Sequence, residues 1–284
     1  MAFSSIRPVC WLHAQSLNTN SYIHIYMLSA KVVQAFGNGG HIVLPKEYVG
    51  KRVQFVTESK TFEDIQSGAL EILKPYLQGI SGVYLYGSYA RNEQAFRSDI
   101  DILVIADTKL KIMGKINDYS IVSTTIDELE YTLEHNAILL LPILKEAKTI
   151  VNPGLLEAYK GCRFTRRNTR LFVDDSRRIL ALNKKGLDLN FEIGSLVYSL
   201  MLRIRGLVII KRILNDQLYS KASLFSYLRG HGFSSQKIGE FYHIYSEERD
   251  GRRVVESETI TRDDVAKLVS IAEKLLGEVQ ILLR

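Results

Sequence analysis

The sequence predicts an α+β protein, with strands and helices in its first half and helices alone in its second. Short β-branched runs broken by glycine stand at residues 30–56. Strands alternate with helices over residues 62–152, as in an α/β unit. From Leu155 onward apolar residues recur at helical spacing, which predicts a bundle. We therefore expect a mixed sheet with helices, a small N-terminal β module and a C-terminal α-helical bundle.

The bulk composition is that of a globular protein with enough apolar residues for a sizeable core. The 284 residues are 46% hydrophobic and 24% charged. The net charge of +6 is compatible with nucleic acid or nucleotide phosphates as partners. Two cysteines, Cys10 and Cys162, give neither a disulfide framework nor a metal-ligand cluster, which indicates a reducing, cytoplasmic location.

No membrane association is expected. The most apolar stretch, Leu196–Leu214, is interrupted by Arg203, Arg205 and Lys211, which a bilayer-spanning helix tolerates poorly. It is predicted to be a core helix of the bundle.

The N-terminal 58 residues are predicted to hold a leader and a small domain. Residues 1–26 lack a charged segment followed by a continuous apolar core, so no signal peptide is expected. We expect residues 1–28 to be a disordered leader, or translation to start at Met27 instead of Met1. Residues 29–58 form the β module. It is too short for a large core, so it should pair with a second copy or dock on a neighbour.

Residues 60–153 are predicted to form the central domain and residues 155–284 the bundle. A short helix should separate the first two strands of the central domain. The predicted elements are a helix at Phe62–Ile80, strands at Gly82–Tyr86, Asp99–Ile105 and Asp118–Thr125, a helix at Ile126–Leu141, and an edge strand at Lys148–Asn152. In the bundle, Thr261 and Asp264 form a capping box that begins the last helix.

Two aspartates stand at the head of a buried strand. Side chains alternate along a strand, so Asp99 and Asp101 project from one face and Ile100 and Ile102 from the other. Two adjacent carboxylates repel unless one takes a proton or a cation lies between them. Oxygen ligands at this spacing suit Mg²⁺, which keeps water and phosphate oxygens as its other ligands.

A glycine-serine turn precedes the aspartates by about a dozen residues. Gly87 permits close backbone approach, and the helix that begins near Ser88 offers free N–H groups to a phosphate. A phosphate site beside a divalent-metal site points to nucleoside triphosphate chemistry.

This stretch resembles the signature of the nucleotidyltransferase superfamily, the polymerase-β-like fold. Asn92 stands where the family usually has glycine, and asparagine visits the left-handed backbone region readily. The residues that carry the resemblance are Gly87, Ser88, Ala90, Arg91, Glu93, Ser98, Asp99 and Asp101.

The resemblance implies a site with two Mg²⁺ ions and a nucleoside triphosphate, with ATP as the expected nucleotide. Arg91 would pair with phosphate or lock the turn through Glu93, and we favour the structural role for both. The implied nucleotide-binding residues are Gly87, Ser88 and Arg91, and the implied metal ligands and catalytic residues are Asp99 and Asp101.

Active members of the superfamily carry a third carboxylate on the next strand. Here the central positions of that strand are Ser120, Val122 and Thr124, so Asp118 at its start is the candidate third catalytic residue. The alternative is that Asp118 is a solvated turn residue.

Residues 36–56 resemble the AbrB/MazE-like swapped-hairpin domain. The resemblance implies a homodimer with two interleaved copies and DNA contact through Lys46, Lys51 and Arg52; alternatively these side chains are only solvated. The matching residues are Gly37, Asn38, Gly39, Leu44, Pro45, Lys46 and Gly50.

The bundle resembles the HEPN and kanamycin-nucleotidyltransferase C-terminal helical domains, with residues 241–254 matching a Tyr-Arg-Asp-Gly helix ending. The Arg and His pair of HEPN ribonucleases is missing, which disfavours ribonuclease activity. Residues 151–214 hold thirteen Lys and Arg against five Asp and Glu, so this face would bind triphosphate or a polyanion such as RNA, or is merely solvated. The cluster comprises Arg163, Arg166, Arg167 and Arg170.

The expected reaction is Mg²⁺-dependent transfer of a nucleoside monophosphate from a triphosphate to a hydroxyl, with release of pyrophosphate. The acceptor would be a protein, an RNA or a small molecule. The minimal family is often paired with toxins, so protein modification resembling AMPylation leads by resemblance. The competing hypothesis is a non-catalytic DNA-binding regulator, or an antitoxin-like dimer, with a decayed nucleotidyltransferase fold.

Overall fold

The computed structural model describes residues 34–37, 39–52, 60–95, 98–252 and 259–284. The chain divides into two compact units, Met1–Glu58 and Ser59–Arg284. The predicted leader, the alternative start at Met27, Cys10 and Asn38 lie outside the described residues.

The first unit contains a short antiparallel hairpin. Strands β1 (Gln34–Phe36) and β2 (Gly39–His41) pair with Gln34 opposite His41, and Gly37 in the connecting turn has a positive φ of 56°. A 3-10 turn, η1 (Lys46–Tyr48), follows. The interleaved homodimer remains a prediction for this hairpin. Several large apolar side chains of the unit are exposed, among them Phe36, Val43 and Val49.

A five-stranded mixed sheet forms the centre of the second unit. The strands lie in the order β5-β6-β4-β3-β7. Only the β4 and β6 pair among these strands is parallel, and the other neighbours are antiparallel. This arrangement confirms the predicted α+β class. The bounds are β3 Ile80–Tyr86, β4 Ile100–Ala106, β5 Lys115–Ile116, β6 Tyr119–Thr125 and β7 Lys148–Val151.

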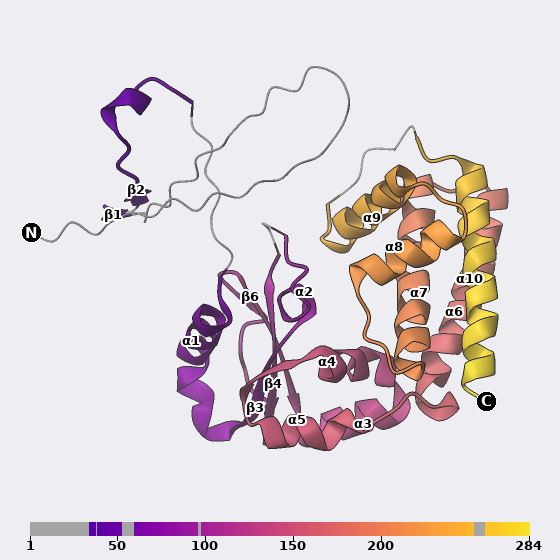
Figure 1. Ribbon diagram of the computed structural model, residues 1–284. Coiled ribbons are helices and arrows are strands. Elements are labelled where there is room, and N and C mark those ends of the chain that lie inside the picture. Colours follow the sequence, from indigo (N-terminus) through magenta and orange to yellow (C-terminus); the bar gives the residue numbers. More distant parts are fainter. Residues whose placement is uncertain (1–33, 38, 53–59, 96–97, 253–258) are drawn as a thin grey trace, which may run out of the picture. The chain divides into compact units, whose positions relative to one another are not determined.

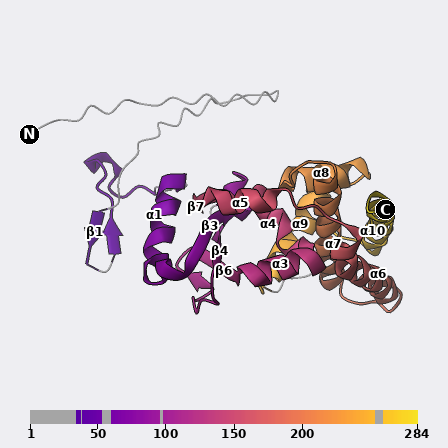
Figure 2. The same ribbon diagram turned by 90° about the horizontal axis from the view of Figure 1, so that it is seen from below.

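Helices cover both faces of this sheet (Figure 2). Successive residues of β4 alternate between the two faces: Ile102 packs in the core beneath α1, and Leu103 packs in the core beneath the other helices. The helices are α1 (Phe62–Leu73) on one face, and α3 (Ile126–His135), α4 (Leu141–Glu146) and α5 (Pro153–Lys160) on the other.

A helical bundle follows the sheet domain (Figure 1), and buried apolar side chains of both form one core. Leu103 of β4, Leu129 of α3 and Leu207 of the bundle belong to one contiguous buried cluster. Because apolar packing is continuous, the bundle is held at a definite position against the sheet. Its helices are α6 (Arg166–Asp188), α7 (Ile193–Leu214), α8 (Lys221–Gly230), α9 (Ser235–Arg249) and α10 (Arg262–Leu282).

Helix α7 is long and apolar enough to cross a membrane by length and composition alone, but its apolar side chains are largely buried within the bundle. The charged residues that interrupt it have partners on neighbouring elements. Arg203 bonds Asp175 at 2.8 Å, and Lys211 bonds Glu278 at 2.7 Å. These contacts agree with the prediction of a core helix.

Two predicted helices end earlier than expected, each near a proline. The helix predicted over Phe62–Ile80 is α-helical only to Leu73, and continues as the 3-10 segment η2 (Lys74–Gly79) with Pro75 in its first turn. The helix predicted over Ile126–Leu141 ends at His135.

Asn136 explains the second interruption, because its φ of −150° and ψ of 59° are not helical. The chain resumes as η3 (Ala137–Leu139) and then α4, which has Pro142 in its first turn. Neither α4 nor the short strand β5 was predicted. The predicted capping box at Thr261 and Asp264 is confirmed at the start of α10.

Candidate functional site

Asp101 lies near the beginning of β4, opposite Tyr86 of β3. Among the described residues its carboxylate has no hydrogen-bond or ion-pair partner. Burial, and then the nearby charge of Asp99, raise the pKa of Asp101 to about 6. Because Ile100 and Ile102 are fully buried on the opposite face, the two aspartates stand apart from the isoleucines as the alternation predicts.

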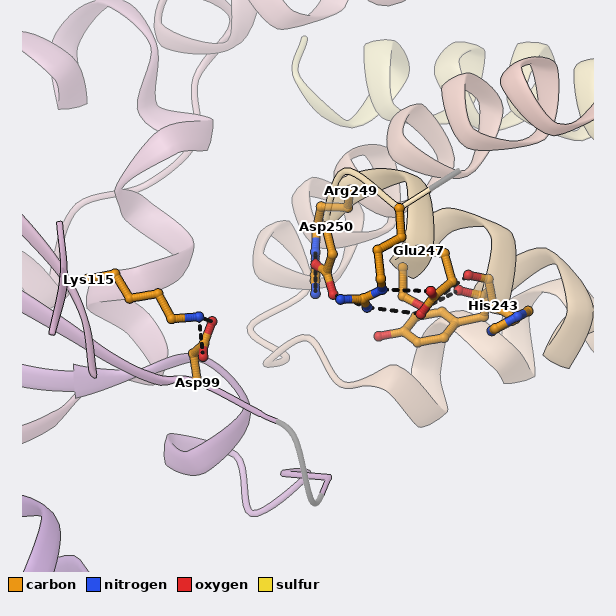
Figure 3. A network of polar contacts seen from close by, with 9 residues as sticks. Asp99, Lys115, His243, Glu247, Arg249 and Asp250 are labelled. Atoms are coloured by element: carbon orange, nitrogen blue, oxygen red, sulfur yellow. Dashed lines mark hydrogen bonds and ion pairs between the residues drawn. The ribbon is translucent and has the colours of Figure 1, made fainter. Parts of the chain in front are cut away.

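Asp99 immediately precedes β4 and is more exposed. Lys115 of β5 donates to both of its carboxylate oxygens, at 2.9 and 3.1 Å, as Figure 3 shows. An ammonium group therefore lies beside the aspartate pair and supplies part of the positive charge that two neighbouring carboxylates require.

Asp118 turns toward a different partner. Its carboxylate bonds Lys60 at 2.7 Å, and its backbone carbonyl accepts from the N–H of Ile100 at 2.8 Å. On β6, the residue in register with Asp101 is Ser120. Within the described part of the chain no three His, Cys, Asp or Glu side chains form a group that could hold a metal. Asp118 as a third catalytic carboxylate thus remains a prediction.

Gly87 is the first residue of α2 (Gly87–Ala90), and its lack of a side chain shapes the site. Its φ is +75°, and a Cβ atom there would lie 2.1 Å from Oδ2 of Asp101. Its backbone N–H donates to Oε1 of Glu146 at 2.8 Å. The N–H of Gly87, at the start of this helix, is therefore already bonded to a carboxylate of the same chain.

Arg91 is held between two carboxylates. Its guanidinium bonds both oxygens of Glu146 at 2.8 Å and Oε2 of Glu93 at 2.9 Å. The side chain of Glu146 is only 9% exposed. Asn92 has a φ of 56°, so it adopts the left-handed conformation expected of an asparagine in place of glycine. These contacts agree with a structural role for Arg91 and Glu93.

Arg249, the last residue of α9, provides positive charge from the bundle. It bonds Asp250 at 3.0 Å, and it is the foremost of the charges that lower the pKa of Asp101. Figure 3 shows Arg249 and Asp250 on the side of the bundle that faces Asp99. The aspartate pair therefore faces an arginine from a segment about 150 residues later in the chain.

Two further basic residues of the bundle lie among aromatic rings. Tyr219 is buried, and the guanidinium carbons of Arg205 and Arg91 lie 5.2 and 5.6 Å from its ring centre. Lys221 lies over the ring of Tyr242 at 4.1 Å. No carboxylate of the described residues pairs with Arg205 or with the ammonium of Lys221. This part of the bundle thus holds positive charge that no carboxylate in the described part of the chain neutralises.

Sequence reasoning missed most of the residues on the bundle side. The resemblance over residues 241–254 indicated the segment that contains Arg249, but not that it approaches Asp101. Glu146, Lys115 and Arg205 belong to no recognisable motif, because their roles depend on contacts between distant segments.

The other predicted residues lie elsewhere. At the start of α6, Arg167 bonds Glu134 at 2.7 Å, so α3 compensates part of the arginine cluster. In the first unit, Lys46, Lys51 and Arg52 are exposed. A pocket of about 630 Å³ beside α6 contains neither Asp99 nor Asp101.

Comparison with known families bears on this arrangement. Residues 69–153 match the family model "Polymerase beta, Nucleotidyltransferase". The match covers the turn, the aspartate pair and Glu146, and it supports the nucleotidyltransferase superfamily for this segment. Residues 16–57 match a different model, "Putative transposon-encoded protein (DUF2080)". The AbrB-like and HEPN-like resemblances remain predictions.

A curated relative is similar over a short stretch. The protein named "Putative protein adenylyltransferase MJ1547" from Methanocaldococcus jannaschii is 50% identical over 46 residues, which is 15% of this chain and 38% of that protein. The chain thus spans well under half of this relative's length.

Two solved structures are similar at low identity. Spectinomycin adenyltransferase AAD(9) from Enterococcus faecialis, solved with ATP and spectinomycin, is 17% identical, with a TM-score of 0.41, over 78% of this chain and all of that one. A nucleotidyltransferase-like protein from Exiguobacterium sibiricum is 12% identical, with a TM-score of 0.36, over 77% of each chain.

Proposed function

We propose that this protein is a nucleotidyltransferase that transfers a nucleoside monophosphate, with ATP as donor, to a hydroxyl group. The observation that carries the proposal is Asp101: a partly buried carboxylate that no described residue pairs with, beside Asp99 and facing Arg249. Such a carboxylate is costly unless a cation or a proton meets it. The family match over residues 69–153 supports the same reaction class.

The donor set fits a magnesium ion. Asp99 and Asp101 offer carboxylate oxygens on one face, and the pKa of Asp101 is raised first by its burial and then by the nearby charge of Asp99. Mg²⁺ binds proteins through one or two carboxylates and keeps water or phosphate oxygens as its other ligands. When bound, it would neutralise charge on the phosphates and lower the pKa of an oxygen nucleophile. A second Mg²⁺ ion is proposed from the family resemblance alone. The role of Asp118 as a third catalytic carboxylate is proposed on the same basis.

The bundle supplies cations suited to the triphosphate. Arg249, Arg205 and Lys221 would bind the β- and γ-phosphates, and Arg205 and Lys221 have no carboxylate partner among the described residues. In the reaction, the acceptor oxygen forms a bond to the α-phosphorus and the bond from that phosphorus to the bridging oxygen breaks. Pyrophosphate leaves with the electron pair, and the acceptor's proton passes to solvent.

We propose a protein side chain as the acceptor, because the curated relative is named a protein adenylyltransferase. An RNA end or a small molecule is the alternative acceptor. The adenyltransferase from Enterococcus faecialis was solved with one small molecule, spectinomycin. We place the reaction in the cytoplasm.

The test is transfer of label from each α-labelled nucleoside triphosphate in the presence of Mg²⁺. Wild type should label itself or proteins of a lysate, and Asp99→Asn combined with Asp101→Asn should abolish labelling. Asp107→Asn is the matched control, because Asp107 follows the other end of β4 and bonds Ser81. Labelling that survives the double substitution contradicts the assignment.

Absence of nucleotide binding would instead favour the DNA-binding regulator. That alternative predicts that Lys46, Lys51 and Arg52 are needed for retention on duplex DNA, which a gel-shift comparison of wild type with the triple alanine variant measures.

A further inference from the structure

A chain of hydrogen bonds links the glycine-serine turn to the bundle. Glu146 accepts from the N–H of Gly87 at 2.8 Å, Arg91 bonds Glu146 at 2.8 Å, and Glu93 bonds Arg91 at 2.9 Å. The second oxygen of Glu93 accepts from the backbone N–H of Lys221 at 2.8 Å. One continuous network therefore runs from α4 through the turn to the first residue of α8.

The side chains of Glu146, Arg91 and Glu93 each bond two partners within this network. Arg91 and Glu93 are 17% and 21% exposed, so water screens their attraction only in part. Glu93 also places its negative charge at the N-terminus of α8, where the free N–H groups and the helix dipole favour an anion. The network is thus expected to be stiff.

The same network lies between the two halves of the proposed site. The aspartate pair belongs to the sheet, whereas Lys221 and Arg205 belong to the bundle. The turn and the bundle meet again at Tyr219, because Arg91 and Arg205 both pack on its ring. Because Glu93 bonds the backbone of Lys221 itself, it fixes where the side chain of that lysine begins.

We propose that Glu93 is a positioning residue for nucleotide binding: it holds the N-terminus of α8, and with it Lys221, at the distance from the aspartate pair that a triphosphate requires. This inference rests on the proposed function. A displacement of about 1 Å can cost about a hundredfold in an enzyme's rate, so a backbone anchor of this kind has consequences beyond stability.

The experiment measures the Kd of MgATP by calorimetry for the full chain, together with the thermal midpoint. Glu93→Gln should raise the Kd about tenfold, because a neutral amide oxygen holds the N–H of Lys221 and the guanidinium of Arg91 more weakly than a carboxylate does. The Mg²⁺ concentration needed for half-maximal ATP binding should stay unchanged, because Glu93 touches neither aspartate. If Glu93→Gln fails to fold, Glu93→Asp, which keeps the charge but shortens the side chain, should show the same rise.

Glu128→Gln is the matched control, since Glu128 also accepts from a backbone N–H at a helix start and bonds a basic side chain, Lys109. It should lower the thermal midpoint without changing the ATP Kd. An unchanged Kd in Glu93→Gln overturns the inference and leaves the proposed function standing, as does a shift in Mg²⁺ requirement alone. A wild-type protein that does not bind ATP overturns the proposed function instead.

Discussion

Gly87 and Asp101 depend on each other for their positions. The backbone of Gly87 approaches the carboxylate so closely that no other residue fits without moving Asp101. The glycine of this motif is therefore required twice, once for its positive φ and once for the space that a side chain would fill.

Gly87→Ala should both destabilise the protein and abolish transfer. A non-glycine residue at such a φ costs about 1–3 kcal/mol, and the new Cβ must also push the Asp101 carboxylate aside. Urea unfolding and nucleotide transfer measure the two effects.

Gly232→Ala is the control that separates the backbone strain of a positive φ from the displacement of the Asp101 carboxylate. Gly232 has a φ of +82°, but its Cβ would meet only the flexible end of Lys267. It should lose stability and keep activity. Comparable activity loss in both variants would show that strain alone is responsible.

Asp101 should make the metal-free protein less stable as the pH rises. Its folded pKa of about 6 lies above the value of about 4 in the unfolded chain, so the folded state binds the proton more tightly. The loss of folding free energy caused by ionising Asp101 grows between about pH 4 and pH 6 and is complete above pH 6. In EDTA, Asp101→Asn should therefore stabilise the protein by about 1–3 kcal/mol at pH 7.5 and by little at pH 4.

Urea unfolding of both proteins across this pH range measures the difference. Mg²⁺ should reduce it by stabilising only the wild type. An equal effect of Asp101→Asn at both pH values would contradict the assigned pKa.

At the scale of the element, the end of α9 gives the bundle its part in the site. Arg249→Gln should raise the Kd of MgATP by about tenfold, because a charge-assisted contact to phosphate contributes about 1.5–3 kcal/mol. Calorimetry measures it, with Arg229→Gln in the last turn of α8 as the control. Equal affinities of Arg249→Gln and wild type would remove α9 from the proposed phosphate site.

The sequence predicted those elements whose signals are local. The run at β4, the capping box of α10 and the left-handed Asn92 were each recognisable from a few neighbouring residues. Two helices ended earlier than their apolar periodicity predicted. The backbone conformation at Asn136 and the proline at position 75 ended them, and periodicity alone does not reveal either effect.

The missing part of the site was of a different kind. Glu146, Lys115 and Arg249 reach it from elements that only the tertiary fold brings together. Charged residues at helix ends are common, so their sequence context alone does not distinguish them from solvated side chains.

At the scale of the molecule, residues 60–284 should unfold as one cooperative unit because sheet and bundle share a core. Leu207→Ala, at a fully buried position of α7, should cost about 2–5 kcal/mol and lower the stability of the sheet equally. Hydrogen exchange of β4 amides measures this coupling. Protection of β4 that is unaffected by the substitution would mean that the two parts unfold separately.

The bond between Glu93 and Lys221 joins residues 128 positions apart. Contacts this distant form late, since most of the intervening chain must be ordered before the two ends meet. The aspartate pair and the cations of the bundle therefore come together only when the sheet and the bundle fold as one unit. The ability to hold a nucleotide should be the last property the protein acquires as it folds, and it should appear with the slowest refolding phase.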